Sequence, residues 1–178
     1  MIYIALGANL QWKGASPEIT LRCAVDAMRD HGLEIINGSP VYINAPVPVS
    51  DQPWFYNAVV ALENAPGPDD LLNILNDIEH AFGRERSVAN APRILDLDII
   101  AYNDDVIAQG NLGIPHPRLQ DRAFVLYPLR DIDPHWLHPI DGVHIRHYID
   151  MLPPEQEIRQ LDAPPVHQGA YQQEAVDV

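Results

Sequence analysis

Apolar residues recur along this chain with two different periods, and each period predicts one kind of secondary structure. Apolar runs that are rich in β-branched residues and bounded by Gly, Asn or Pro are typical of strands. They occur at residues 3–6, 33–43, 58–62 and 93–102. Apolar residues that repeat every three or four positions are typical of helices. They occur at residues 16–32 and 68–83.

The order of these segments predicts the fold class. Strand, helix, strand, strand, helix, strand is the order of a split βαβ arrangement. We therefore expect an α+β, ferredoxin-like βαββαβ sandwich in which the sheet is antiparallel and both helices cover one face. Further along the chain, the pattern predicts a short extra strand and two C-terminal helices. These lie at residues 106–108, 121–129 and 144–152.

Length and composition favour one domain. The chain has 178 residues, and 47% of them are hydrophobic, which is enough to form one substantial core. We assign residues 1–153 to a single domain. Residues 154–178 are rich in Pro, Gln and acidic residues and contain few large apolar side chains. We expect them to form a mobile tail.

The sequence also indicates where the protein acts. It contains no run of about 18 apolar residues that would span a bilayer, and its first residues lack the basic region and the length of a signal peptide. The single cysteine, Cys23, has no partner for an internal disulfide, which agrees with a reducing compartment. We expect the protein to act in the cytoplasm as a monomer.

Residues 92–100 read Pro-Arg-Ile-Leu-Asp-Leu-Asp-Ile-Ile and carry the most specific chemical signal in the chain. In a strand, Asp96 and Asp98 lie on one face about 6 to 7 Å apart, while the apolar residues between them point the other way. Two carboxylates so close together repel each other and need a positive partner when they are partly buried. Mg²⁺ is a candidate, because it binds carboxylates together with substrate phosphates. A half-exposed strand with a polar face explains the spacing equally well.

The charge of the chain points to the same kind of ligand. A net charge of −14 argues against binding to nucleic acid or to an anionic membrane, since both need an excess of Lys and Arg. Ten of the eleven basic residues are arginines, and six of them lie between Arg84 and Arg130. Arginine grips phosphate oxygens through a planar fork of N–H groups. This segment is therefore a candidate phosphate site, although its arginines could also simply offset the acidic residues nearby.

Two common phosphate-binding motifs, GxxxxGK[ST] and GxGxxG, are absent from the sequence. A nucleotide would therefore be held by side chains and metal, not by a glycine-rich backbone. The run Pro115-His116-Pro117-Arg118, followed by Arg122 and Phe124, forms a second polar cluster. His116 can donate to a phosphate near neutral pH, although histidines with a purely structural role are common.

Together, these motifs resemble those of a known enzyme family. The aspartate segment, the Pro-His-Pro-Arg cluster and the upstream run Asp51-Gln52-Pro53-Trp54-Phe55-Tyr56-Asn57 are similar, in type and order, to the motifs of hydroxymethyldihydropterin pyrophosphokinase of folate synthesis. The resemblance covers residues 1–150. It implies transfer of pyrophosphate from ATP to the hydroxymethyl group of 6-hydroxymethyl-7,8-dihydropterin, with release of AMP.

The resemblance also implies roles for individual residues. The expected metal ligands, which would hold two Mg²⁺ ions, are Asp96 and Asp98. The expected catalytic residues are Arg84, Arg93, Asp96 and Asp98. The expected ATP-binding residues are Glu79, Arg86, Arg93, Ile99, His116 and Arg122. The expected pterin-binding residues are Asn44, Ala45, Val47, Phe55, Asn57 and Phe124.

Two other classes of function fit parts of the sequence. A metal-dependent phosphohydrolase could use the same aspartates and deliver water to the phosphate instead of excluding it. A non-catalytic ferredoxin-like regulatory module could have the same order of elements. A histidine-based metal site is a further alternative, but no acidic residue or cysteine stands at convincing ligand spacing. Its histidines would be His135, His138, His144 and His147.

Overall fold

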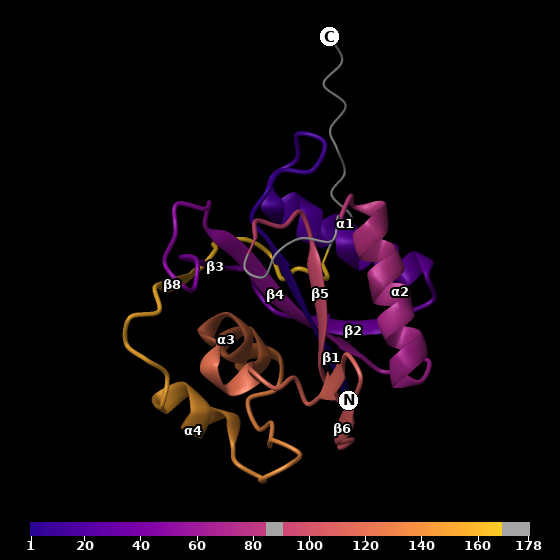
Figure 1. Cartoon of the computed structure of the whole chain (residues 1–178), viewed down its shortest axis with the longest axis vertical. Helices are drawn as coiled ribbons and strands as arrows, with labels where there is room; N and C mark the ends of the chain where they lie inside the picture. The colour runs from indigo at the N-terminus through magenta and orange to yellow at the C-terminus, as the bar shows by residue number, and fades with distance from the viewer. Residues whose placement is uncertain (85–90, 169–178) are drawn as a thin grey trace.

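The computed structural model describes residues 1–84 and 91–168 of the chain. Within these residues, six strands form one antiparallel sheet in the order β5-β1-β4-β3-β8, with β2 also paired to β4 (Figure 1). The strands are β1 (Ile2–Ala8), β2 (Ile35–Gly38), β3 (Tyr42–Asn44), β4 (Phe55–Leu62), β5 (Asp96–Tyr102) and β8 (Ile158–Gln160). A separate pair consists of β6 (Ile107–Gln109) and β7 (Leu112–Ile114).

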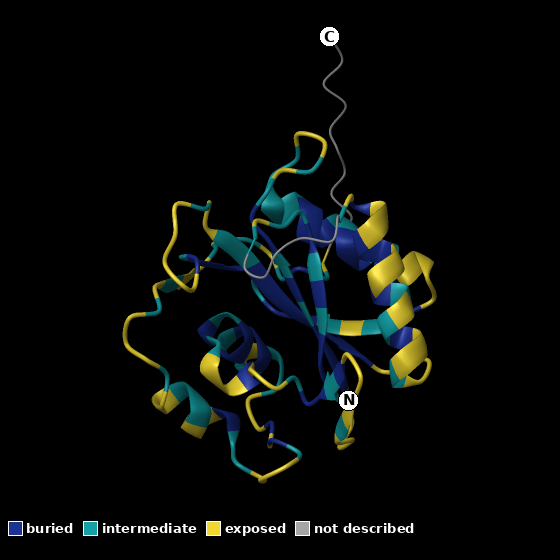
Figure 2. Ribbon diagram, in the orientation of Figure 1, coloured by how far each residue is buried: buried dark blue, intermediate teal, exposed yellow. Residues whose placement is uncertain are grey.

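Helices cover both faces of the sheet and enclose two hydrophobic cores (Figure 1). On one face lie α1 (Pro17–Asp30) and α2 (Pro68–Ala81), and on the other lie η1 (Leu119–Asp121), α3 (Ala123–Ile132) and α4 (Ile145–Asp150). The alternation of side chains along each strand supplies both cores. In β1, Ile4 and Leu6 pack toward α1 and α2, whereas Tyr3 packs toward α3. Figure 2 shows the resulting buried sheet between helices with exposed outer sides.

The observed order of elements confirms the predicted ferredoxin-like fold class. The chain forms β1, α1, the β2–β3 segment, β4, α2 and β5 in sequence, and α1 and α2 share one face of the sheet. Ser16 caps the N-terminus of α1, because its Oγ accepts a hydrogen bond from the Ile19 N–H at 3.4 Å. The predicted extra strand and the two C-terminal helices also form, with ends shifted by a few residues.

The strands β7 and β8 have no counterpart in the sequence prediction. β8 contains a single apolar residue, so it carries no alternation that a pattern could detect. It forms because the free edge of β3 offers unpaired backbone groups, and Tyr42 pairs with Gln160 there. Beyond β8, Val166 is buried and the Arg22 guanidinium donates to the carbonyl of Pro164 at 2.8 Å. β8, Pro164 and Val166 therefore contact the domain, and the expected mobility of the tail over 154–178 stays a prediction.

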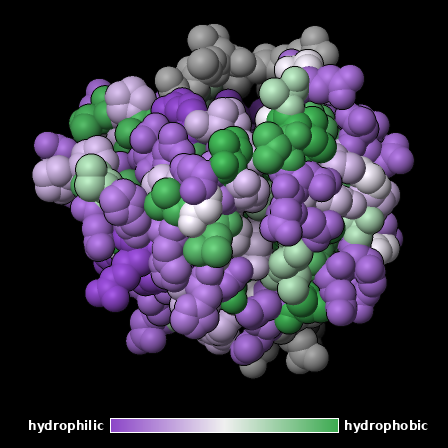
Figure 3. Space-filling model, turned by 90° about the horizontal axis from the view of Figure 1, so that it is seen from below, coloured by the Kyte–Doolittle hydropathy of each residue, from purple (hydrophilic) through white to green (hydrophobic). Residues whose placement is uncertain are grey.

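Exposed apolar side chains are scattered over the surface of the protein. On the face shown in Figure 3, hydrophilic groups predominate and hydrophobic groups form distinct small patches. Exposed large apolar side chains of the described residues include Val49, Val106, Ile140 and Met151, which belong to different segments. Scattered apolar groups of this kind are common on protein surfaces. In the part of the chain that is described, no helix has the length and apolar character needed to cross a membrane.

One carboxylate lies on the packing face of α2. The Glu79 side chain is only 2% exposed and lies in the same row as Leu75 and Ile78. Its Oε1 accepts a hydrogen bond from the Leu97 N–H at 2.6 Å, and its Oε2 pairs with Arg84. Glu79 thereby links α2 to the start of β5. Burial raises the pKa of Glu79 to about 7, although the contacts with Leu97 and Arg84 favour the charged form.

This buried carboxylate makes the stability of the fold depend on pH. Because folding raises the pKa of Glu79 from 4.5 to about 7, its stabilising contribution is complete below pH 4.5 and is lost as the pH rises through about 7. Urea unfolding across this window should show that the free energy of unfolding of the wild type falls as the pH rises. Relative to that of Glu79→Gln, it should fall by at most about 3 kcal/mol. Parallel curves for the two proteins would contradict this prediction.

Candidate active site

A cavity of about 200 Å³ is lined by residues from β1, β3, β4, β5, η1 and α3. It brings together most of the residues that the sequence singles out. Those that line it are Asn44, Val47, Phe55, Asn57, Arg93, Asp96, Asp98, Arg122 and Phe124. These residues belong to segments far apart in the sequence, so the fold joins the three sequence motifs in one space.

The remaining predicted site residues lie around this cavity or away from it. Ala45 follows a lining residue, and its N–H donates to the carbonyl of Glu157 at 3.2 Å. The Ile99 side chain packs in the core beneath α1 and α2, on the opposite face of β5 from the two aspartates, so its side chain does not line the cavity. Arg84 contacts Asp96, and His116 lies near Asp98, so both lie beside the cavity. Glu79 contacts Arg84. Arg86 lies outside the described residues.

The two aspartates share one face of β5, as the spacing predicts. Leu95, Leu97 and Ile99 belong to the core beneath α1 and α2, so Asp96 and Asp98 face the layer of η1 and α3. The side chains of Asp96 and Asp98 are 29% and 38% exposed, and both line the cavity. The strand thus holds two carboxylates at the cavity wall while its other face is anchored in the core.

Arginines surround Asp96. Arg93 Nη1 lies 2.6 Å from Asp96 Oδ1, and Arg84 Nη1 lies 3.2 Å from the same oxygen. Arg84 also pairs with Glu79, so one guanidinium connects the buried carboxylate of α2 to the first carboxylate of β5. This arrangement offsets the negative charge of the aspartate and places cationic N–H donors at the cavity.

Asp98 has more distant partners. Its Oδ2 lies 3.9 Å from His116 Nε2 and 4.0 Å from Arg122 Nη1, which are ion-pair distances at the upper limit of direct contact. Loss of hydration and repulsion from Asp96 raise the pKa of Asp98 above its usual range, and the nearby arginines oppose this shift only in part. A cation added beside Asp98 would therefore favour the charged form of its carboxylate.

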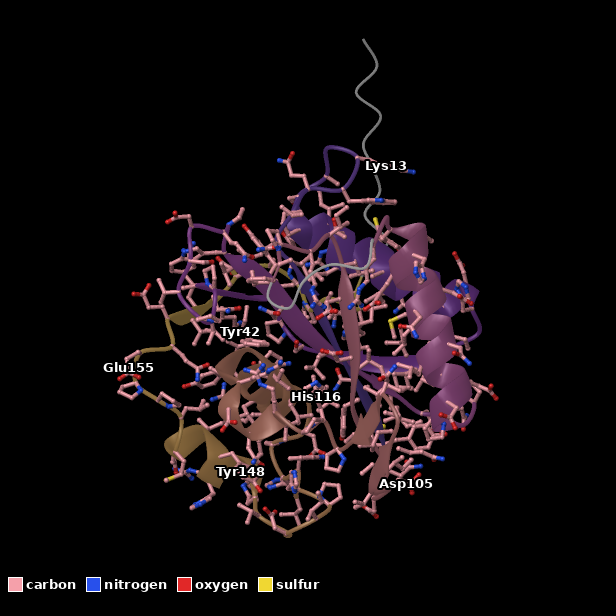
Figure 4. All side chains as sticks on the ribbon, viewed as in Figure 1. Lys13, Tyr42, Asp105, His116, Tyr148 and Glu155 are labelled. Carbon is pink, nitrogen blue, oxygen red and sulfur yellow. The ribbon has the colours of Figure 1, made fainter. Side chains whose placement is uncertain are left out.

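His116 is held as a neutral hydrogen-bond donor. The Arg118 N–H donates to His116 Nδ1 at 3.1 Å, so the ring hydrogen of the neutral form sits on Nε2, the atom that faces Asp98. Burial, together with the positive charge of Arg122, lowers the pKa of His116 to about 4. Figure 4 shows His116 in the interior between α3 and β5. At neutral pH, His116 can donate from Nε2 without adding a charge.

The opposite side of the cavity carries amides and rings. Asn57 Nδ2 donates to Asn44 Oδ1, and Asn44 Nδ2 donates to the carbonyl of Ala45 at 2.8 Å. A Cβ atom at Gly7 would lie 2.9 Å from Asn57 Oδ1, so glycine at this position leaves room for the amide. Phe55 and Phe124 also line this side. Together these groups suit a flat heteroaromatic ring whose edge forms hydrogen bonds.

Asn9 is a structural residue of the site that the sequence reasoning missed. It is 2% exposed, its Oδ1 accepts from the Arg93 N–H at 2.8 Å, and its Nδ2 donates to the carbonyl of Pro53 at 3.1 Å. Nδ2 also lies 3.2 Å from Gln52 Oε1. One side chain thereby connects the proline-rich loop to the segment of Arg93. The available signal was a polar residue directly after the first apolar strand.

Other lining residues also received no role from the sequence. Gln52 and Arg118 belong to the motifs quoted above, and the structure places both at the cavity wall. Arg118 could have been proposed from its position in the Pro-His-Pro-Arg cluster. The remaining lining residues without an assigned role include Ser50 and Asp121.

The histidine-rich segment does not form a second site. His138 Nδ1 lies 3.3 Å from Asp141 Oδ1, and Tyr148 donates to Asp141 Oδ2 at 2.6 Å, so these side chains brace the connection between α3 and α4. Among residues 1–84 and 91–168, no three His, Cys, Asp or Glu side chains are grouped so that they could hold a metal ion. The histidine-based metal site therefore has no support in the described structure.

Comparison with known proteins identifies the family. The family model for 7,8-dihydro-6-hydroxymethylpterin-pyrophosphokinase (HPPK) matches residues 3–134. A Pseudomonas aeruginosa protein named 2-amino-4-hydroxy-6-hydroxymethyldihydropteridine pyrophosphokinase is 40% identical over 153 residues, which cover 85% of this chain and 91% of that protein. The folic acid synthesis protein fol1 of Pneumocystis carinii is 36% identical over 176 residues, or 99% of this chain and 22% of that protein.

Solved structures agree on the fold. The crystal structure of Plasmodium falciparum HPPK-DHPS matches with a TM-score of 0.68 and 16% sequence identity, over 84% of this chain and 44% of that one. The chain thus spans less than half of this longer protein and about a fifth of the Pneumocystis protein, but nearly all of the Pseudomonas enzyme. The chain belongs to the 7,8-dihydro-6-hydroxymethylpterin-pyrophosphokinase family.

Proposed function

We propose that this protein transfers pyrophosphate from ATP to the hydroxymethyl group of 6-hydroxymethyl-7,8-dihydropterin, a step of folate biosynthesis that gives AMP and the pterin pyrophosphate. The observation that carries the proposal is the single cavity in which an aspartate pair with arginines faces amides and phenylalanine rings. A transfer between two substrates needs both to be held next to each other in one orientation. The two chemically different sides of the cavity meet that need.

The carboxylates fit a magnesium site. Asp96 and Asp98 provide oxygen ligands on one face of β5 at the cavity wall, which is the kind of site that holds Mg²⁺ together with substrate phosphates. The raised pKa of Asp98 reflects an environment in which an added positive charge is favourable. We propose that these two residues hold two Mg²⁺ ions. When bound, the ions would neutralise charge on the triphosphate and on the oxygens of the displacement.

The cationic residues act on the phosphate chain. In the proposed reaction, the hydroxymethyl oxygen forms a bond to the β-phosphorus and loses its proton to solvent, the bond from that phosphorus to the α-phosphate oxygen breaks, and AMP leaves with the electron pair. Arg93 and Arg122 line the cavity and stabilise the negative charge on these oxygens. His116 donates its Nε2 hydrogen to a phosphate oxygen. Arg84 acts from its position beside Asp96.

The amide and aromatic side holds the pterin. Asn57 Nδ2 donates one of its two hydrogens to Asn44, and Asn57 Oδ1 can accept a hydrogen bond from the edge of the ring. Phe55 and Phe124 contact the faces of the ring. Val47 and the backbone at Ala45 close the pocket from the proline-rich loop. For Glu79, Arg86 and Ile99, a role in nucleotide binding stays a prediction from the family resemblance.

The cellular setting is also proposed. We infer that the protein acts in the cytoplasm as a monomer and has no nucleic acid partner. The net charge of −14 supports the last point, because nucleic acid repels an acidic protein.

Product analysis tests the reaction. With ATP, Mg²⁺ and the pterin, AMP should appear in step with the pterin pyrophosphate, and no AMP should form when the pterin is left out. A metal-dependent phosphohydrolase would instead release ADP or free phosphate whether or not the pterin is present. That second outcome would overturn the proposed function.

Substitution of a single carboxylate tests the aspartate pair. Asp98→Asn should reduce pyrophosphoryl transfer by about three orders of magnitude, because it replaces an anionic ligand of the charge-neutralising metal ions with a neutral one. The far-UV circular dichroism spectrum should stay unchanged, since the side chain lies at the cavity wall and not in the core. The matched control is Asp105→Ala, an exposed aspartate just beyond the end of β5. Retained turnover in Asp98→Asn would refute the assignment.

A further inference from the structure

The side chain of Gln156 bridges the two peptide groups that flank Arg122. Its Oε1 accepts a hydrogen bond from the Ala123 N–H at 3.0 Å, and its Nε2 donates to the carbonyl of Asp121 at 2.9 Å. The backbone of Arg122 is therefore held on both sides by one residue that lies far along the chain. Neither the sequence pattern nor the proposed mechanism accounts for this contact.

The bridge provides a hydrogen-bond acceptor for the N-terminus of α3, which has no capping side chain of its own. Ala123 is the first residue of α3, and the N–H groups of a first helical turn have no partner within the helix. The residue at the cap position is Arg122, whose side chain makes no capping hydrogen bond. Gln156 supplies the missing acceptor from outside the helix. The junction between η1 and α3 thus depends on the C-terminal segment.

Arg122 is the residue that spans both sides of the cavity. Its Nη1 lies 4.0 Å from Asp98 Oδ2, and its guanidinium carbon lies 5.5 Å from the centre of the Phe124 ring. The backbone of Arg122 is extended, with φ −115° and ψ 102°, between the short helix and α3. A rotation of this backbone would move the guanidinium away from the phosphate side and displace the ring beneath it.

The same C-terminal segment also contacts the cavity wall formed by β3. The carbonyl of Glu157 accepts from the Ala45 N–H at 3.2 Å, and Ile158 of β8 pairs with Asn44 at the end of β3. Residues 156–158 therefore contact the wall formed by α3 and the wall formed by β3. In Figure 1, β8 lies beside β3 after the chain has passed from α4 along the side of the molecule.

We propose that Gln156 is a positioning residue for the reaction, which acts by fixing the backbone of Arg122. This inference rests on the proposed function, because it assumes that Arg122 acts on the phosphates of ATP. Gln156 is not among the residues that line the cavity, so it does not touch the reacting atoms itself. Its effect reaches the cavity through Arg122 and the adjoining Phe124.

Kinetics of matched glutamine variants test the proposal. Gln156→Ala should lower kcat/KM about tenfold at temperatures well below unfolding, a change equal to about 1.4 kcal/mol. Hydrogen exchange at the Ala123 amide, followed by NMR, should become faster in the same variant. The control is Gln160→Ala, an exposed glutamine four positions further along the same segment, which should keep wild-type kinetics and exchange. Identical kinetics in the two variants would overturn the proposal.

A conservative variant separates positioning from general stability. Gln156→Glu keeps an acceptor for the Ala123 N–H at the helix N-terminus, where a negative charge is also favourable, but it has no donor for the carbonyl of Asp121. It should therefore recover part of the kcat/KM that Gln156→Ala loses. Equal losses in the two variants would show that the acceptor does not matter and would contradict the proposed bridge.

A double-mutant cycle tests whether Gln156 acts through Arg122. Titration of α,β-methylene-ATP with Mg²⁺ should show that Gln156→Ala weakens binding severalfold in the wild type and has no further effect in Arg122→Ala. Fully additive losses would overturn the proposed route. A wild type that forms no AMP with the pterin would contradict the proposed function. An active wild type with additive losses would contradict only the role of Gln156.

Discussion

The site depends on one electrostatic constraint, the placement of two carboxylates on the same face of β5. The other face of the strand is fixed in the core by Leu95, Leu97 and Ile99, so the aspartates cannot turn away from each other. Their mutual repulsion must be offset by positive charge. Among the described residues, arginines lie close to Asp96, whereas the charged partners of Asp98 are more distant. This imbalance supports the proposal that the pair holds metal ions carried with a triphosphate.

The fold turns this strand into a site by bringing remote segments to it. β1 pairs with both β5 and β4, so the aspartates and the amide of Asn57 lie on neighbouring parts of one sheet. Gly7 leaves space between them, and Asn9 holds the backbone of Arg93 against the proline-rich loop. The charged side and the amide and aromatic side of the cavity are therefore parts of one hydrogen-bonded framework, which suits the proposed reaction between two bound substrates.

Periodicity predicted the strands and helices of the sandwich and the face on which the aspartates lie, because those features follow from burial of apolar side chains. It did not predict β8, which has one apolar residue and forms by pairing with a free edge. It also missed the structural roles of Asn9 and Gln156 and the burial of Glu79. Asn9 and Gln156 act through contacts with distant parts of the chain, and local sequence carries no record of such partners. Glu79 instead lies in the apolar row of α2, so helical spacing could have indicated its burial.

The most direct test of the central claim is calorimetric titration of α,β-methylene-ATP into the protein with and without Mg²⁺. If Asp96 and Asp98 hold the metal ions that carry the triphosphate, the nucleotide should bind with measurable heat when Mg²⁺ is present, and removal of Mg²⁺ should weaken binding by at least about tenfold. Equal affinity under both conditions would contradict the account.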